Sequence, residues 1–165
     1  MEKPPAFYEK QYFRQWWMWS ILIALSGLFI YACFFQLGSG GAFGDNPMSD
    51  PGLILATVII LALLTLFWFQ GLHTRVDDEG VHIRYRPFHR KWKTYRWKDI
   101  GSAEVKRFNP MMDYGGWGIK NGSYTVQGRM GVLLKFHNRL TVMIGTQKPD
   151  ALKEAIGTFT NATNP

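Results

Sequence analysis

Two long uncharged stretches decide the fold class of this chain: "WWMWSILIALSGLFIYACFFQL" at residues 16–37 and "GLILATVIILALLTLFWFQGL" at residues 52–72. An α-helix needs about 20 apolar residues to cross the roughly 30 Å hydrocarbon core of a bilayer, and both stretches reach that length. Tryptophans stand near one end of each stretch, where amphipathic rings favour the membrane interface. They are Trp16, Trp17, Trp19 and Trp68. The sequence therefore predicts two transmembrane helices.

Two other interpretations fit these stretches less well. Buried core helices would need a large soluble shell, which a chain of 165 residues does not supply. A secretory signal has an apolar region of about 7–15 residues that ends at a small-residue cleavage site. The first stretch is longer and ends in Phe34, Phe35, Gln36 and Leu37, although the Gly-Ser run at 38–41 resembles such a site. We therefore predict that both spans are retained.

The distribution of charge predicts the topology. The loop between the spans, residues 38–51, carries Asp45 and Asp50 but no Lys or Arg. The N-terminal segment carries Lys3, Lys10 and Arg14, and a dense basic region follows the second span. Because Lys and Arg near span ends favour the cytoplasmic side, we expect a multi-pass inner-membrane protein with both termini cytoplasmic. Residues 1–72 would then form the N-terminal segment and anchor, and residues 73–165 a cytoplasmic domain.

The C-terminal half has the alternating pattern of half-buried β-strands. Val81, Ile83 and Tyr85 alternate with polar residues after the turn "DDEG" (77–80), and similar alternation recurs over residues 95–98, 103–106, 132–136 and 140–144. Near the C-terminus, "KPDALKEAIGTF" (148–159) places Leu152, Ile156 and Phe159 on one face of a helix. Periodicity therefore predicts an α+β chain: a helical hairpin, then a small β-barrel or sandwich with a C-terminal helix.

Four blocks of this region resemble one protein family. "YRWKDIGSAEV" (95–105), "YGGWGIK" (114–120), "YTVQGRMGVLLKF" (124–136) and "VMIGTQKPDALKEAI" (142–156) are similar to bacterial membrane-anchored proteins with a pleckstrin-homology-like (PH-like) domain, many of uncharacterised function. The resemblance covers roughly residues 74–157. It implies an antiparallel β-barrel of about seven strands whose open end is closed by the C-terminal α-helix.

The glycine-rich stretch "DYGGWGIKNG" (113–122) is not typical of a phosphate-binding loop. A dinucleotide loop needs GxGxxG opening a helix, and a P-loop needs Gly-Lys-Ser/Thr; neither spacing is present, and a strand pattern follows. We expect a hairpin in which glycines permit tight turns and Trp117 packs on the barrel. The alternative is a partner-binding loop that exposes Met111, Met112 and Trp117.

The strongest functional signal is the basic and aromatic stripe "RYRPFHRKWKTYRWK" (84–98). Its basic members are Arg84, Arg86, Arg90, Lys91, Lys93, Arg96 and Lys98. Basic residues near an anionic leaflet gain about 1 kcal/mol each, so the stripe is a candidate contact with the lipid surface. Some eukaryotic PH-like domains bind phosphoinositides at a comparable hairpin, which leaves specific headgroup recognition as one alternative. A solvated strand face is the other.

Nothing in the sequence indicates an enzyme. Cys33 is the only cysteine and lies inside the first span, the four histidines lack metal-binding spacing, and Ser102 and Ser123 have no evident triad partner. We therefore expect no catalytic residue, no metal site and no cofactor. The formal net charge of +7 would suit nucleic acid, but a tethered domain with one short stripe does not.

These observations predict a non-catalytic integral membrane protein that presents a cytoplasmic PH-like domain as an interaction or scaffold module. The alternative function is binding of anionic lipid headgroups, or sensing of the membrane surface. The expected partners are the lipid bilayer and a protein that the sequence does not identify, with a homo-oligomer left open and no nucleic acid.

Overall fold

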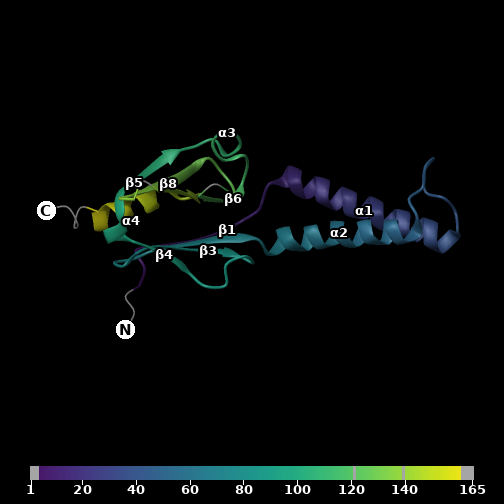
Figure 1. The fold of residues 1–165 in the computed structure, drawn as a ribbon, viewed down its shortest axis with the longest axis horizontal. Coiled ribbons are helices and arrows are strands. Elements are labelled where there is room, and N and C mark those ends of the chain that lie inside the picture. Colours follow the sequence, from purple (N-terminus) through teal and green to yellow (C-terminus); the bar gives the residue numbers. More distant parts are fainter. Residues whose placement is uncertain (1–3, 121, 139, 161–165) are drawn as a thin grey trace. The chain divides into compact units, whose positions relative to one another are not determined.

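The structure is a computed structural model that describes residues 4–120, 122–138 and 140–160 (Figure 1). The chain divides into two compact units. The helical unit comprises residues 14–69, and the β unit combines the residues up to Phe13 with those from Gln70 onward. The helical unit is therefore an insertion in the chain of the β unit.

The helical unit contains two helices, α1 (Trp16–Ser39) and α2 (Asp50–Phe69). Both are long and apolar enough to cross a membrane, which agrees with the two predicted apolar helices. The second helix ends three residues before the predicted boundary at residue 72, because the chain becomes a β-strand at Gly71.

Most of the buried residues of the two helices are small or polar. Ser26 and Ala32 of α1 and Leu53 and Thr57 of α2 are buried, and small side chains allow close approach of helix backbones. Cys33 Sγ lies 3.0 Å from Thr57 Oγ1. The large apolar side chains of both helices mostly point outward.

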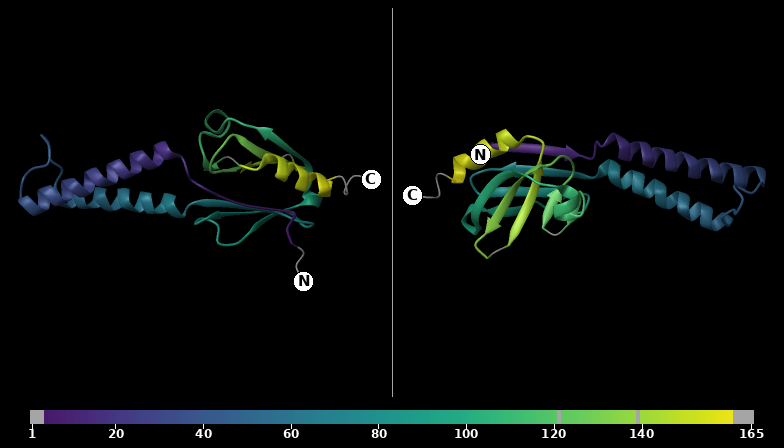
Figure 2. Two further views of the ribbon diagram at one scale, coloured as in Figure 1. Left: turned by 180° about the vertical axis from the view of Figure 1, so that it is seen from behind. Right: turned by 90° about the horizontal axis from the view of Figure 1, so that it is seen from above.

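The β unit contains two sheets (Figures 1 and 2). The first sheet has the order β1-β2-β3-β4, and every pair in it is antiparallel. Its strands are β1 (Phe7–Tyr12), β2 (Gly71–Val76), β3 (Gly80–Arg86) and β4 (Lys93–Arg96). The sheet therefore joins a strand that precedes the helical unit to three strands that follow it.

The second sheet has the order β5-β8-β9-β7-β6 and is mixed, because β7 and β9 run parallel. Its strands are β5 (Ile100–Arg107), β6 (Gly118–Lys120), β7 (Ser123–Thr125), β8 (Met130–Phe136) and β9 (Thr141–Thr146). The 3₁₀ turn η1 (Trp97–Asp99) connects the two sheets, and the short helix α3 (Pro110–Tyr114) connects β5 to β6.

The C-terminal helix α4 (Pro149–Thr160) packs against β1, β5 and β8 (Figure 2). Leu152 and Ile156 are buried, and the Phe159 ring stacks on Trp97 with centroids 5.8 Å apart. The predicted apolar face of this helix is therefore confirmed. The core also contains alternate residues of β3, namely Val81, Ile83 and Tyr85, as their period-2 pattern predicts.

A buried polar network links β1 to the end of β9. Glu9 accepts hydrogen bonds from the Thr146 hydroxyl at 2.7 Å and the Gln147 amide at 2.9 Å. The Gln11 side chain donates to the Gly145 carbonyl at 2.7 Å. Because the partners are more than 130 residues apart in sequence, this network fixes the N-terminal strand against the second sheet.

The described residues contradict the predicted closed barrel. Nine strands form two separate sheets, eight of them after α2, where about seven were expected. The four-residue β4 pairs only with β3, and the chain leaves it through η1 without a ladder to β5. A barrel needs every edge strand to be paired, and β4 and β5 each keep an edge.

The glycine-rich stretch forms turns, as expected. Gly115 ends α3 in the left-handed conformation with φ 68°, and Gly122 lies between the paired strands β6 and β7 with φ 75°. A Cβ atom at Gly122 would lie 2.8 Å from the Thr141 carbonyl oxygen, so a side chain does not fit there. The segment after Trp117 is a strand and not a helix, as the sequence pattern predicted.

Candidate functional site

One face of the first sheet collects most of its basic side chains, and we call it the basic face. Strand register places Lys10, His73 and Arg84 in one row across β1, β2 and β3. A second row contains Tyr8, Arg75, His82 and Thr94, and a third contains Tyr12, Gly71 and Arg86. Arg96 of β4 pairs with Gly80 on the same side, so the basic face draws cationic residues from all four strands. The opposite face carries the buried core residues of the sheet.

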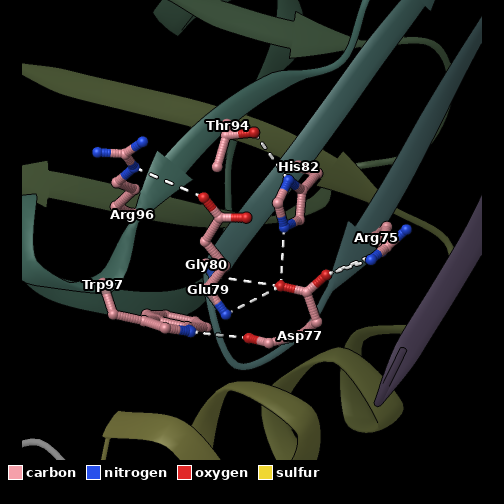
Figure 3. Close-up of polar contacts among 8 residues, drawn as sticks. All are labelled: Arg75, Asp77, Glu79, Gly80, His82, Thr94, Arg96 and Trp97. Atoms are coloured by element: carbon pink, nitrogen blue, oxygen red, sulfur yellow. Dashed lines mark hydrogen bonds and ion pairs between the residues drawn. The ribbon is translucent and has the colours of Figure 1, made fainter. Parts of the chain in front are cut away.

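A buried carboxylate organises one end of this face (Figure 3). Asp77 Oδ2 accepts from Arg75, with both the Nε and Nη2 atoms 2.8 Å away. Its Oδ1 lies 2.8 Å from His82 Nε2 and also accepts from the backbone amides of Glu79 and Gly80. His82 Nδ1 in turn lies 2.8 Å from the Thr94 hydroxyl. Asp77 therefore holds the β2–β3 turn and orients both His82 and Arg75.

These hydrogen bonds set the charge state of Asp77. Burial raises the pKa of a carboxyl group, but hydrogen bonds from His82 and Arg75 outweigh burial and hold the pKa of Asp77 below its usual range. The chain Asp77–His82–Thr94 has the order of a hydrolase triad. However, Oδ1 also accepts from the turn amides of Glu79 and Gly80, and Oδ2 accepts from Arg75, which is what a structural anchor requires.

His73, at the centre of the basic face, has an unusual environment. Only 4% of its surface is exposed, and neither ring nitrogen has a hydrogen-bond partner in the part of the chain that the structure describes. Burial, together with the charges of Arg84, Arg86 and Lys10, lowers the pKa of His73 to about 4. His73 is therefore neutral at pH 7. Its unpaired ring nitrogens are a cost to the fold, because a buried polar atom without a hydrogen-bond partner costs about 1–3 kcal/mol.

Aromatic rings enclose this histidine. The Tyr12 ring lies edge-on to His73 with centroids 6.2 Å apart, and the Trp92 ring lies 6.5 Å away. Arg84 packs on the same Trp92 ring at 4.9 Å from its centroid. The rings cover the imidazole and hold the guanidinium of Arg84 beside it.

The structure divides the predicted basic stripe among four places. Arg84, Arg86 and Arg96 lie on the basic face. Arg90 and Lys91 are exposed in the segment between β3 and β4. Lys93 pairs with Ile83, which places it on the opposite face, and Lys98 belongs to η1. Adjacent strand residues point to opposite faces, so consecutive positions could not form one surface.

Lys93 and Lys98 line an open groove of about 480 Å³ between β4 and the β8–β9 hairpin. Its apolar wall includes Tyr95, Phe136 and Leu140. The Nζ atom of Lys93 donates a hydrogen bond to the Tyr124 hydroxyl at 3.0 Å, so this lysine already has a partner within the protein.

The predicted partner-binding loop is only partly exposed. Met111 and Met112 lie on α3, with 63% and 83% of their surfaces exposed. Asn109 caps this helix by accepting from both of their amides. Trp117 is half-buried and its ring nitrogen donates to the Gly128 carbonyl at 3.3 Å. The two methionines therefore offer a surface, whereas Trp117 packs against the protein.

Sequence reasoning did not assign Lys10, His73 and Arg75 to this site. In the sequence Lys10 indicates only topology, because the segment "FYEKQY" (7–12) lacks the alternation of apolar and polar residues that predicts a strand. Its strict alternation in burial is visible only in the structure, where Phe7, Glu9 and Gln11 are buried and the residues between them are exposed.

Within the described ranges, no cluster of three or more His, Cys, Asp or Glu side chains is placed to hold a metal ion. Comparisons of the chain with protein-family models, with curated proteins and with solved structures found no match.

We expect Asp77→Asn to destabilise the β unit by about 2–4 kcal/mol at pH 7, because it leaves Arg75 and His82 without their carboxylate. The lowered pKa means that this stabilisation is present above the usual carboxyl pKa of about 3.9 and is lost as the pH falls through the lower, folded-state value. Urea unfolding of the full-length protein in neutral micelles, followed by tryptophan fluorescence, measures the difference.

Asp78→Asn, at the exposed neighbouring position of the same turn, is the matched control and should unfold like the wild type. A difference between Asp77→Asn and wild type that is equally large at pH 7 and at strongly acidic pH would contradict the assigned role of the carboxylate.

Proposed function

We propose that this protein is a non-catalytic integral membrane protein of the inner membrane that presents a cytoplasmic PH-like β unit as an interaction module. The observation that carries the proposal is the insertion of two long apolar helices between β1 and β2. An apolar hairpin that leaves and re-enters the same sheet ties the β unit to the membrane at two points.

The surface of the helices supports membrane anchoring. Ile23 and Leu55 are each 61% exposed, and Phe34 is 80% exposed, in a unit whose buried positions are mostly small or polar. A soluble helix pair would bury its large apolar residues, whereas lipid accommodates them on the outside. The charge distribution supports cytoplasmic termini, because the loop between the helices has acidic residues and no basic ones.

The α3 surface supports a role in protein interaction. Met111 and Met112 are neighbouring exposed apolar side chains on a capped helix, and flexible methionines suit a protein contact. The PH-like assignment is supported by the C-terminal helix packed on two β-sheets, and it extends the resemblance of the four sequence blocks. Cys33, the only thiol, lies within α1 and next to Thr57, which favours packing over catalysis.

Cysteine accessibility tests the anchoring and topology. In a Cys33→Ser background, Ser49→Cys in the loop between the helices should react with a membrane-impermeant thiol reagent added to spheroplasts. Lys153→Cys, exposed on α4, should react only after detergent lysis. The reverse pattern would contradict cytoplasmic termini, and labelling of both positions before lysis would contradict a membrane-spanning hairpin.

A second candidate function is attraction to an anionic leaflet, and the basic face favours it. Its Tyr12–Gly71–Arg86 row lies close along the chain to both helices, since Tyr12 precedes Trp16 by four residues and Gly71 follows Phe69 by two. Arg84 and Lys10 occupy the next row. Cations held this near a leaflet add about 1 kcal/mol each and are screened by salt.

A polarity-sensitive dye at Arg90→Cys, again with Cys33→Ser, tests this second function in nanodiscs. We expect the dye to report a less polar environment in phosphatidylglycerol than in phosphatidylcholine, and high salt should remove the difference. Arg84→Gln with Arg86→Gln should also remove it, whereas Lys106→Gln with Arg107→Gln on β5 should not. Equal emission in the two lipids at low salt would rule this function out.

A further inference from the structure

The most unusual group in the β unit is the buried, neutral histidine on its basic face. Only 4% of the His73 surface is exposed, and both of its ring nitrogens lack a hydrogen-bond partner among the described residues. The Nε atom of the neighbouring Arg84 is also buried without one. A neutral imidazole carries one N–H donor, so His73 and its cross-strand partner Arg84 each have an N–H group that needs an acceptor.

The charges around these groups have one sign. Lys10 and Arg84 flank His73 in the same row, and Arg86 lies one row away. All three cations act on His73 strongly enough to oppose its protonation. None of the three forms an ion pair with a carboxylate in residues 4–120, 122–138 and 140–160. The nearest buried acid on this face, Asp77, is already bonded to Arg75 and His82.

This arrangement selects an acceptor with negative charge. A cation would be repelled by three positive side chains, and an apolar molecule would leave the N–H groups unpaired. A compact oxyanion can accept from several donors at once, and guanidinium groups bind such anions through paired N–H bonds. The rings of Tyr12 and Trp92 lie against His73, so an anion that reaches this residue has to be compact.

We propose that the basic face holds a site for a tetrahedral oxyanion, phosphate or the phosphate of a monoester, formed by Lys10, His73, Arg84 and Arg86. The site is a property of the β unit and depends neither on membrane topology nor on the partner proposed above. It differs from general attraction to an anionic surface because it requires a particular histidine.

Binding of the anion should change the protonation of His73. Without a ligand, burial and three cations keep its pKa at about 4. The groups that face it are Lys10 and Tyr12 from β1, Arg84 and Arg86 from β3, and the Trp92 ring. A bound dianion offsets the cations and accepts from the imidazolium, so the pKa of His73 rises and the site takes up a proton.

The test uses full-length protein in neutral micelles with histidine labelled at the Cε1 carbon, and His73→Phe identifies the signal. Inorganic phosphate should shift the His73 signal. Sulfate keeps a constant charge from pH 5 to 7, so its affinity for the protein should rise as the pH falls, because binding takes up a proton at His73. Lys10→Gln removes one exposed cation and should weaken phosphate binding about tenfold. Lys106→Gln removes the same charge from exposed β5 and should leave it unchanged.

A second arm identifies the source of the anion. A His73 shift with inorganic phosphate assigns a soluble ligand, whereas a shift only in phosphatidate nanodiscs, and not in phosphatidylcholine, assigns a lipid headgroup. Absence of a shift with both probes would overturn the site. Equal weakening by Lys10→Gln and Lys106→Gln would also overturn it, because binding would then depend on net charge alone.

Discussion

The pairing of β1 with β2 is the interaction on which the β unit depends. Six residue pairs, from Phe7 with Val76 to Tyr12 with Gly71, join segments separated by the whole helical unit. This pairing turns β2 from an edge strand into a central one and places Glu9 against the end of β9. A fragment that begins at residue 73 would lose β1 and the first two residues of β2. The β unit and the helical hairpin are therefore connected by two chain crossings rather than by one linker.

The same pairing produces the candidate site. β1 brings Lys10 and Tyr12 to a face whose titratable and charged residues from the other strands are His73, Arg75, His82 and the arginines of β3 and β4. Two kinds of electrostatic environment then lie within one sheet. Around Asp77, opposite charges meet and satisfy one another with four donors. Around His73, like charges meet, and no carboxylate of the described residues forms an ion pair with Lys10, Arg84 or Arg86, so the ring is left buried and neutral. The polar groups at the first place are satisfied by one another, whereas those at the second are the ones we propose to bind an anion.

The sequence predicted those elements whose apolar residues follow a simple period. The two uncharged stretches became α1 and α2, the alternation of Val81, Ile83 and Tyr85 became β3, and the spacing of Leu152 and Ile156 became the buried face of α4. It missed β1 because that strand has the opposite chemistry. Its buried side includes Glu9 and Gln11, and its exposed side includes Tyr8 and Tyr12, so hydrophobicity does not alternate as burial does.

Long-range pairing accounts for the other differences. The basic stripe is continuous in sequence, yet the period of a strand and the segment between β3 and β4 divide it, and the residues that complete the site come from β1 and β2. The predicted barrel was wrong because closure requires the edge strands β1, β4, β5 and β6 of the two sheets to pair with one another, and no local pattern encodes such pairing. Burial of a histidine among cations is likewise a property of neighbours 63 and 11 residues away, Lys10 and Arg84.

Amide hydrogen exchange across residues 7–12 of the full-length protein, measured by NMR in neutral micelles, tests the pairing most directly. The structure predicts that alternate amides of this segment, those directed toward β2, exchange as slowly as their partners in residues 71–76. Exchange of all six at the rate of an unstructured peptide, while β2 and β3 stay protected, would show that the sheet forms without β1 and would contradict this account.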